Sequence, residues 1–530
     1  MPSLLSLNAK GNRMTYDGTA PAQLESFKSH YGGVYSFPVC DDIYERLKEW
    51  AGNTLTIDEK VIDAVGVMID RAESLIELAQ AEDCEGDPRL FPWQRVAVRW
   101  FKAIRRGVLC DEQGAGKTVS SLMAMDQTCH GRVLVICNDT KRDDWVEHAK
   151  EWMVARRAFN LTGSPDDREW ALMEWRADSK AVLVTNYKNA HTHKTDLEKA
   201  EGVIIDEAHR LRNRQTKVLF KTAQSLCSKA SDVHLLTATP MINMSDDVWA
   251  LLNLCDRSRF SSYWGFVYRF CEVTHDGFGL KVGHVRSDEV ERLTRIIEPY
   301  CLVRSDLMNL PRPEKRIVRY AMSGDQLKLY EAMLEIGQCS HAGEEVSVGV
   351  EIARITRLRQ LALHPALLFE EYVGPSKLDA LTAVVAERSS KALVFFSYAE
   401  MLPLAQGHLK RAGISAEILR GGMTENARRN SLESFRSGSA QVLLLTHGVG
   451  GEGLNLVEAD RVIFMELAWH PAGNRQAMGR IRRPGQVSER LEAIIIHTQD
   501  SIEDHILSIV RDKRQVTVEE LRRRVAQSRK

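Results

Sequence analysis

Short, continuous apolar runs alternate with amphipathic segments along most of the chain. Such runs are typical of strands buried on both faces of a parallel sheet, and the segments between them have the periodicity of crossover helices. A first series comprises Gly107–Cys110, Arg132–Cys137, Ala181–Thr185, Gly202–Ile205 and His234–Pro240. A second series comprises Lys391–Ser397, Glu417–Gly422, Gln441–Thr446 and Arg461–Met465. We therefore expect an α/β protein with two parallel-sheet lobes in tandem.

Both ends of the chain lie outside these two series. Residues 1–85 are expected to form a separate accessory region, with amphipathic helical patterns in Asp42–Trp50 and Ile57–Gln80. The acidic turn Glu82–Asp87 is typical of a linker. Residues 501–530 are charged and helical in pattern, and we expect them to form a C-terminal helical brace.

Composition narrows the class of protein but not its partner. A length of 530 residues allows about three domains. With 71 Lys and Arg against 72 Asp and Glu, the net charge of -1 excludes a uniformly basic nucleic-acid binder, although a groove can still be locally positive. No apolar run reaches the roughly 18 residues of a membrane-spanning helix, so we expect a soluble intracellular protein. The ten cysteines include no C-x-x-C pair, which favours reduced core thiols over disulfides or zinc ligands.

The segment Cys110–Thr118 reads as a strand end, a tight glycine turn and the start of a helix. In this interpretation backbone N–H groups cradle phosphates at the helix N-terminus, Lys117 reaches the outer phosphates and Thr118 contacts a magnesium ion. Asp111 stands where the common phosphate loop has its first glycine, so a chance glycine turn is the alternative. The residues expected to surround the nucleotide in this loop are Gly114, Ala115, Gly116, Lys117 and Thr118.

Gln94 precedes the phosphate loop by some twenty residues and has two interpretations. Its amide can donate and accept together, which suits the N6/N7 edge of adenine. It could equally be a polar residue at a helix N-terminus, and the sequence alone favours neither.

The run Gly202–Arg210 contains an acidic pair directly after a buried strand. Parallel strands end at one edge of the sheet, so Asp206 and Glu207 are expected at the phosphate site. Asp206 can hold magnesium, and Glu207 can take a proton from an attacking water. The alternative is a pair of N-cap acids that begins the next helix. The following strand ends in Thr237 and Thr239, whose hydroxyls suit a hydrogen-bonded relay that couples the site to its surroundings.

Two more strands of the first series end in polar segments. Asn138 and Lys141 follow one strand, and Asn186 follows another. These are candidates for contact with a nucleic-acid backbone, because open sheets bind ligands at this edge. Ordinary polar loops are an equal alternative.

Near the end of the second series, residues 474–486 carry a Q-x-x-G-R-x-x-R spacing. On a helix, Gln476, Gly479, Arg480 and Arg483 would project from one face. Guanidinium groups in that position could reach a γ-phosphate, whereas a solvated basic helix face is the alternative.

The segments DEQGAGKT, DEAHRLRNRQTK and LTATPMINMSDDVWALL resemble those of the SWI/SNF-type ATPases of helicase superfamily two. The likeness extends from about Leu90 to Arg514, with Ile297–Asp306 similar to the family's lobe-connecting segment. It implies RecA-like lobes over 86–312, with a helical protrusion near 256–300, and over 313–500. It also implies ATP and Mg2+ as cofactors, and catalytic roles for Lys117, Glu207, Arg480 and Arg483.

The same resemblance implies a double-stranded DNA track, a monomeric protein and movement along or remodelling of DNA. Further residues implied to bind nucleotide are Gly453 and Gln476, and those implied to bind nucleic acid are Ser397, Thr446, Asn455 and Trp469. The turn Gly448–Asn455 departs from the family, which usually has an arginine where Gly448 stands. Glu466–Pro471 resembles the HARP-type annealing helicases.

Two other functions remain open at this stage. One is an RNA-unwinding helicase, and the other is an ATP-gated nucleic-acid clamp that does not move. The compact size favours the cytoplasm of a bacterial or phage-infected cell, with the nucleus as the location if the protein is eukaryotic.

Overall fold

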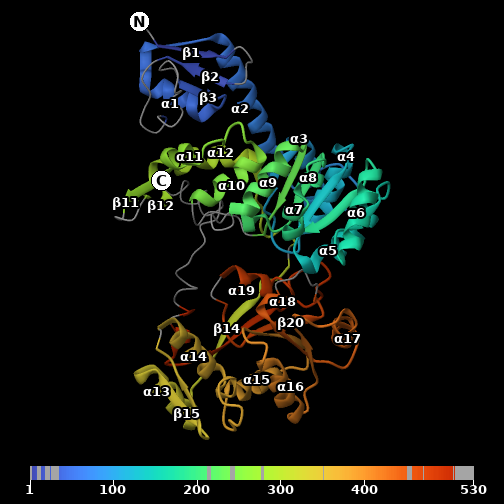
Figure 1. The fold of residues 1–530 in the computed structure, drawn as a ribbon, viewed down its shortest axis with the longest axis vertical. Helices are drawn as coiled ribbons and strands as arrows, with labels where there is room; N and C mark the ends of the chain where they lie inside the picture. Colours follow the sequence, from blue (N-terminus) through green and yellow to red (C-terminus); the bar gives the residue numbers. More distant parts are fainter. Residues whose placement is uncertain are drawn as a thin grey trace. The chain divides into compact units, whose positions relative to one another are not determined.

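The computed structural model describes most of the chain. The described residues are 3–8, 13–17, 24, 35–211, 217–238, 245–275, 280–308, 310–349, 351–450, 456–468, 471–504 and 506–507. The chain divides into two compact units, which are described separately below (Figure 1). The first includes Met1–Glu112 and Gly116–Leu307, and the second includes Gln113–Ala115 and Met308–Arg514. No helix among the described residues has the length and apolar character needed to cross a membrane.

The first unit is built on a seven-stranded sheet in the order β13-β5-β10-β9-β6-β8-β7, with every neighbouring pair parallel. The predicted strands are confirmed as β5 (Arg106–Leu109), β6 (Val133–Cys137), β8 (Val182–Asn186), β9 (Gly202–Ile205) and β10 (Asp232–Leu236). Two strands were not predicted, β7 (Ala158–Asn160) and β13 (Cys301–Leu302). The latter lies in the segment that was expected only to connect the lobes.

Helices cover this sheet and bury its side chains on both faces. They are α3 (Pro92–Ile104), α4 (Lys117–Thr128), α5 (Arg142–Trp152), α6 (Pro165–Ala177), α7 (Tyr187–Thr192), α9 (Lys217–Lys229) and α10 (Ser245–Cys255). Along β6, Val133 and Val135 belong to one hydrophobic cluster, whereas Leu134 and Ile136 belong to the cluster on the opposite face. This alternation explains why the strand is a continuous apolar run in the sequence.

The second unit has a six-stranded sheet in the order β14-β21-β20-β17-β19-β18, again parallel throughout. Its predicted strands are confirmed as β17 (Lys391–Phe396), β18 (Ala416–Leu419), β19 (Val442–Thr446) and β20 (Ala459–Phe464). The strands β14 (Glu314–Tyr320) and β21 (Glu492–Thr498) were not predicted. Helices α14 (Glu351–Leu363), α15 (Lys377–Ala386), α16 (Met401–Arg411), α17 (Glu425–Arg436) and α19 (Pro471–Met478) accompany the sheet. The predicted fold class, two parallel-sheet lobes, is therefore confirmed.

The accessory region at the N-terminus contains a small sheet that the sequence did not predict. Its order is β3-β2-β1-β4, from β1 (Ser3–Leu7), β2 (Arg13–Tyr16), β3 (Tyr35–Pro38) and β4 (Leu55–Ile57). The two predicted helices are confirmed as α1 (Asp41–Ala51) and α2 (Glu59–Gln80). Leu75 of α2 belongs to the hydrophobic cluster that includes Phe101 of α3, so this region packs against the first sheet's helices.

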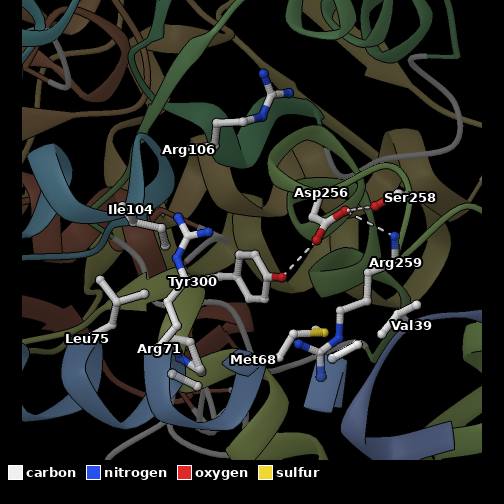
Figure 2. Close-up of a pocket in the computed structure, with 13 residues that line it drawn as sticks. Val39, Met68, Arg71, Leu75, Ile104, Arg106, Asp256, Ser258, Arg259 and Tyr300 are labelled. Atoms are coloured by element: carbon white, nitrogen blue, oxygen red, sulfur yellow. Dashed lines mark hydrogen bonds between the residues drawn. The ribbon is translucent and has the colours of Figure 1, made fainter. Parts of the chain in front are cut away.

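The predicted protrusion near 256–300 contains helices and also a hairpin. Its elements are α11 (Tyr263–Phe270), the antiparallel strands β11 (Cys271–His275) and β12 (Leu280–Val285), and α12 (Val290–Ile297). A cavity of about 400 Å³ lies between α2 and the segments on either side of this protrusion. In Figure 2, the Tyr300 hydroxyl donates to Asp256 beside Arg259 and Met68.

Candidate functional site

The carboxyl end of β5 leads through a glycine turn into α4, which confirms the predicted strand–turn–helix arrangement. Gly114 and Gly116 have φ angles of 89° and 77°, in the left-handed region that favours glycine. Gly116 is the N-cap of α4, and Lys117 is the first helical residue. A Cβ atom on Gly116 would overlap the side-chain amide of Gln94. Both the backbone conformation at position 116 and the packing of Gln94 therefore require glycine there.

Gln94 lies at the start of α3, and its side chain has a local structural function. Its Oε1 accepts a hydrogen bond from the backbone N–H of Phe91 at 2.9 Å, which caps the helix. The side chain is buried, with its amide against Gly116. The helix-terminus interpretation therefore describes its contacts, and the adenine contact stays a prediction.

Lys117 is held by the phosphate loop itself. Its Nζ donates to the carbonyl oxygens of Asp111 and Glu112 at 2.7 and 3.0 Å. Burial lowers the pKa of Lys117, against the opposing effect of the negative charges of Asp111, Glu207 and Asp206. The carbonyl oxygens that Lys117 contacts are acceptors that the oxygens of a bound phosphate could replace.

The acidic pair follows β9, as predicted, and lies at the same sheet edge as the phosphate loop. Asp206 is 6% exposed, and its Oδ2 accepts hydrogen bonds from Lys141 Nζ and Trp145 Nε1, both at 3.2 Å. Its Oδ1 accepts from the backbone N–H of Glu207 at 3.0 Å. The Tyr187 hydroxyl donates a hydrogen bond to the backbone carbonyl of Asp206 at 2.6 Å. The aspartate is thus fixed in position by donors on three elements.

Glu207 has a φ of 53°, which is unusual for a residue with a side chain. Its Oε2 lies 3.2 Å from His209 Nδ1, and its Oε1 lies 3.7 Å from Lys141 Nζ. Burial acts to raise the pKa of Glu207, but the hydrogen bond from His209 and the charges of Lys141, His209 and Lys117 outweigh it and lower the pKa to about 2. Thr237 Oγ1 lies 3.4 Å from the same His209 nitrogen, and its role in a relay stays a prediction.

The residues proposed to contact nucleic acid lie at the carboxyl ends of β6 and β8. Asn138 accepts a hydrogen bond from Arg210, and Asn186 donates to Asp139 Oδ1 at 2.6 Å. The Lys141 ammonium group instead forms ion pairs with both Asp206 and Glu207. The sequence did not indicate this position for Lys141, nor the contact of His209 with Glu207.

Arg480 and Arg483 of the second unit do not lie on a helix, contrary to the prediction. Helix α19 ends at Met478, and residues 479–483 form turns. Gly479 disfavours continuation of the helix, and the backbone N–H of Arg480 bonds to the carbonyl of Ala477 at 3.1 Å, which tightens the last turn. Gln476 alone of the four motif residues is helical. Arg480 is fully buried, so the alternative of a solvated basic helix face does not apply to it.

The predicted nucleic-acid residues of the second unit are partly described. Ser397 and Thr446 lie half-buried at the carboxyl ends of the adjacent strands β17 and β19. Two residues after the end of β20, the buried Glu466 accepts a hydrogen bond from the backbone N–H of Ser397, with 3.4 Å between the nitrogen and Oε2. Four predicted residues lie outside the described part of the chain: Thr239, Gly453, Asn455 and Trp469.

Two family models match the chain. The model described as SNF2-related domain matches residues 63–367, and the helicase conserved C-terminal domain matches residues 376–485. The chain belongs to the SNF2-related family. The SWI/SNF-type resemblance read from the sequence is therefore confirmed.

Two curated relatives of this SNF2-related protein show how much of the chain is shared. The ISWI chromatin-remodeling complex ATPase CHR11 of Arabidopsis thaliana is 27% identical over 444 residues, which cover 77% of this chain and 40% of the relative. Nuclear protein STH1/NPS1 of Saccharomyces cerevisiae is 27% identical over 445 residues, 76% of this chain and 32% of the relative. The chain thus spans two fifths or less of the length of these relatives.

Among solved structures, this SNF2-related chain is similar to the Sulfolobus solfataricus SWI2/SNF2 ATPase core in complex with dsDNA. The match has 22% identity and a TM-score of 0.38, and it covers 81% of this chain and 92% of the other.

The donor set at this edge of the SNF2-related fold suits Mg2+. Among the described residues, no group of three or more His, Cys, Asp or Glu side chains forms a ready-made metal site. Mg2+ is usually bound by one or two protein oxygens together with substrate phosphates and water. The Thr118 hydroxyl in the first turn of α4 and the Asp206 carboxylate are oxygens of the required kind.

Proposed function

We propose that this protein hydrolyses ATP in a DNA-dependent manner and uses the cycle to move along or remodel duplex DNA. The observation that carries the proposal is the convergence of Lys117, Asp206 and Glu207 at one sheet edge in an SNF2-related chain. The named activity of its relatives supports the same class, since CHR11 is a chromatin-remodeling complex ATPase.

The site residues of the first unit then have distinct roles in hydrolysis. Lys117 exchanges its contacts with the Asp111 and Glu112 carbonyls for phosphate oxygens of ATP. Thr118 and Asp206 would hold Mg2+, which supplies charge neutralisation at the phosphates when bound. Glu207, kept ionised and oriented by His209 and Lys141, positions the attacking water and receives its proton.

Arg480 and Arg483 are proposed to contribute positive charge during the same hydrolysis step. Support comes from the Q-x-x-G-R-x-x-R spacing and from the match of residues 376–485 to the helicase conserved C-terminal domain. Arginine is the side chain suited to this task, because its planar guanidinium can donate two parallel hydrogen bonds to phosphate oxygens. Gln476 is proposed to contact nucleotide with them.

Nucleic acid is proposed to lie along the strand ends of each sheet. Asn138 and Asn186 provide amides there in the first unit, and Ser397 and Thr446 provide hydroxyls in the second. Such groups bond to phosphate and sugar oxygens and fix register without reading base sequence.

The test is a comparison of ATP hydrolysis with duplex DNA, single-stranded DNA and RNA of equal length. We expect duplex DNA to raise the initial rate most, with a stimulation that falls steeply as salt increases, because binding to phosphates releases counterions. Stronger stimulation by RNA would replace the proposal with an RNA helicase. No hydrolysis under any condition would refute the nucleotide site.

A further inference from the structure

The first residue of the phosphate loop carries a buried ion pair that nucleotide binding does not require. Asp111 is 1% exposed, and its carboxylate receives two hydrogen bonds from Arg304, at 2.6 Å to Oδ2 and 2.9 Å to Oδ1. Burial raises the pKa of Asp111, and the Arg304 guanidinium opposes that shift. A buried carboxylate costs desolvation free energy, so its presence at the position of a common loop glycine calls for a specific function.

Arg304 connects this carboxylate to two other parts of the first unit. It lies two residues after the end of β13 and three residues before Leu307, where the first unit ends. The β13 residue Leu302 accepts a hydrogen bond from the backbone N–H of Cys110 at 2.8 Å. Arg304 Nη2 also donates to the carbonyl of Trp93 at 2.9 Å, beside the Gln94 that packs on Gly116. One guanidinium therefore holds the start of the loop and the helix that supports its end.

The same loop residue is held by the nucleotide-binding lysine. Lys117 Nζ donates to the backbone carbonyl of Asp111, while Arg304 forms an ion pair with the side chain of Asp111. An ammonium group has three donors, and phosphate oxygens compete for them when ATP binds. Loss of the carbonyl contact frees the backbone at Asp111. The side-chain contact then carries that change to Arg304.

We propose that Arg304 is a positioning residue that transmits the nucleotide state of the phosphate loop, through Asp111, to the segment leaving the first unit at Leu307. The inference rests on the proposed function, because it assigns Lys117 to ATP. Arg304 touches neither substrate nor reacting atoms in this mechanism. Its role is to make the start of the connecting segment respond to whether ATP is bound.

Arg304→Lys in the full-length protein is the sharpest test. Lysine keeps the charge but lacks the fork that binds both Asp111 oxygens and the Trp93 carbonyl together. Arg105→Lys is the matched control, because Arg105 makes a two-pronged pair with the buried Asp232, at 2.7 Å for each contact, away from the loop. The readouts are amide hydrogen exchange of residues 300–308, with and without a non-hydrolysable ATP analogue, and the ratio of DNA-stimulated to basal ATPase rates.

In the wild type and in Arg105→Lys, we expect the analogue to change exchange in residues 300–308. In Arg304→Lys that change should disappear, and the stimulation ratio should fall by at least about fivefold, the lower end of typical coupling between sites. Analogue-dependent exchange in Arg304→Lys equal to that of the wild type would overturn the inference. A wild type whose exchange does not respond to the analogue would overturn it as well.

Asp111→Asn provides a second route if Arg304→Lys does not fold. Asparagine keeps the size of the side chain and removes its charge, so the same loss of response in residues 300–308 is expected, and a normal response would overturn the inference. A DNA-independent wild-type rate would instead count against the proposed function, since the exchange measurement needs no DNA.

Discussion

At the residue level, Lys117 and Glu207 lie close enough to shift each other's pKa, but the tasks proposed for them are separable. Glu207→Gln keeps the size and hydrogen-bonding capacity of the side chain yet cannot accept a proton, so hydrolysis should fall by at least about a hundredfold while ATP still binds. Lys117→Ala removes a charge that binds phosphate, so ATP binding should be lost too. Nucleotide binding and single-turnover hydrolysis, measured on both variants, check this. Equal loss of ATP binding in the two variants would contradict the assignment of Glu207.

The buried Glu466 of the second unit is expected to make the stability of the protein depend on pH. Burial raises the pKa of Glu466 to about 7, with Glu503 acting in the same direction and with Lys377 and Arg359 opposing it. The backbone carbonyl of Glu466 contacts His447 Nε2 at 3.0 Å. Because the folded state holds the proton more tightly than the unfolded state, this contribution to stability is complete below the ordinary pKa of 4.5 and is lost as the pH rises through about 7.

Glu466→Gln should therefore stabilise the protein relative to wild type more at pH 8.5 than at pH 5.5. The difference should be on the order of 2 kcal/mol, since the glutamine amide carries no charge at either pH. Denaturant unfolding at both pH values measures it, and Glu489→Gln, at an exposed position, is the control. A pH-independent difference would show that Glu466 does not titrate in this range.

Among the elements, helix α1 links the accessory region to the rest of the first unit through ion pairs. Asp42 of α1 pairs with Arg269 of α11 at 2.7 Å and with Arg46 at 2.9 Å, and Arg46 pairs in turn with Glu289 at 2.5 Å. All four side chains are less than a tenth exposed. At the rim, Glu49 of α1 pairs with Arg292 at 2.7 Å, but Glu49 is 63% exposed.

Removing one member of this buried network should cost much more than removing a rim residue. Asp42→Ala leaves buried guanidinium groups without their carboxylate, which typically costs about 3–5 kcal/mol. Glu49→Ala should cost less than about 1 kcal/mol, because an exposed pair is screened by water. Free energies of unfolding, with limited proteolysis between α1 and α2, distinguish the two. Similar small effects would mean that the network does not hold the region in place.

The elements that the sequence predicted are those whose environment is uniform along their length. Strands such as β6 and β19 are buried on both faces, so their apolar runs could be recognised without tertiary information. By contrast, β14 alternates exposed and half-buried residues at a sheet edge, and β13 has two residues that pair with β5. Those strands depend on partners distant in the chain, which no local pattern shows.

The same distinction separates the predicted site residues from the missed ones. Gly116, Lys117, Asp206 and Glu207 follow buried strands, so the sheet edge where they meet could be predicted. The missed contacts join distant segments: Lys141 and Asp206 are 65 residues apart, and Arg304 and Asp111 are 193 residues apart. Asp111 in place of a glycine was the one local signal of the second contact.

At the scale of the whole molecule, the two units repeat one construction. In the first, Arg106 at the start of β5 donates to the carbonyls that end α9 and α10, including Cys227 and Cys255. In the second, the buried Arg461 of β20 donates to the carbonyl of Val384, in the last turn of α15, and to those of Arg388 and Ser390, which follow the helix. Each arginine lies toward the start of its strand and satisfies carbonyl groups in or just after a helix end, whereas open parallel sheets bind ligands at the carboxyl ends of their strands.

Triplex displacement is the direct test of the proposal that ATP hydrolysis drives movement along duplex DNA. A fluorescent third strand is annealed to a duplex, and its release is followed with ATP, with a non-hydrolysable analogue and with the Glu207→Gln variant. We expect release by the wild type with ATP and none in the other two cases. DNA-stimulated hydrolysis without third-strand release would contradict it and would identify an ATP-gated clamp that does not move.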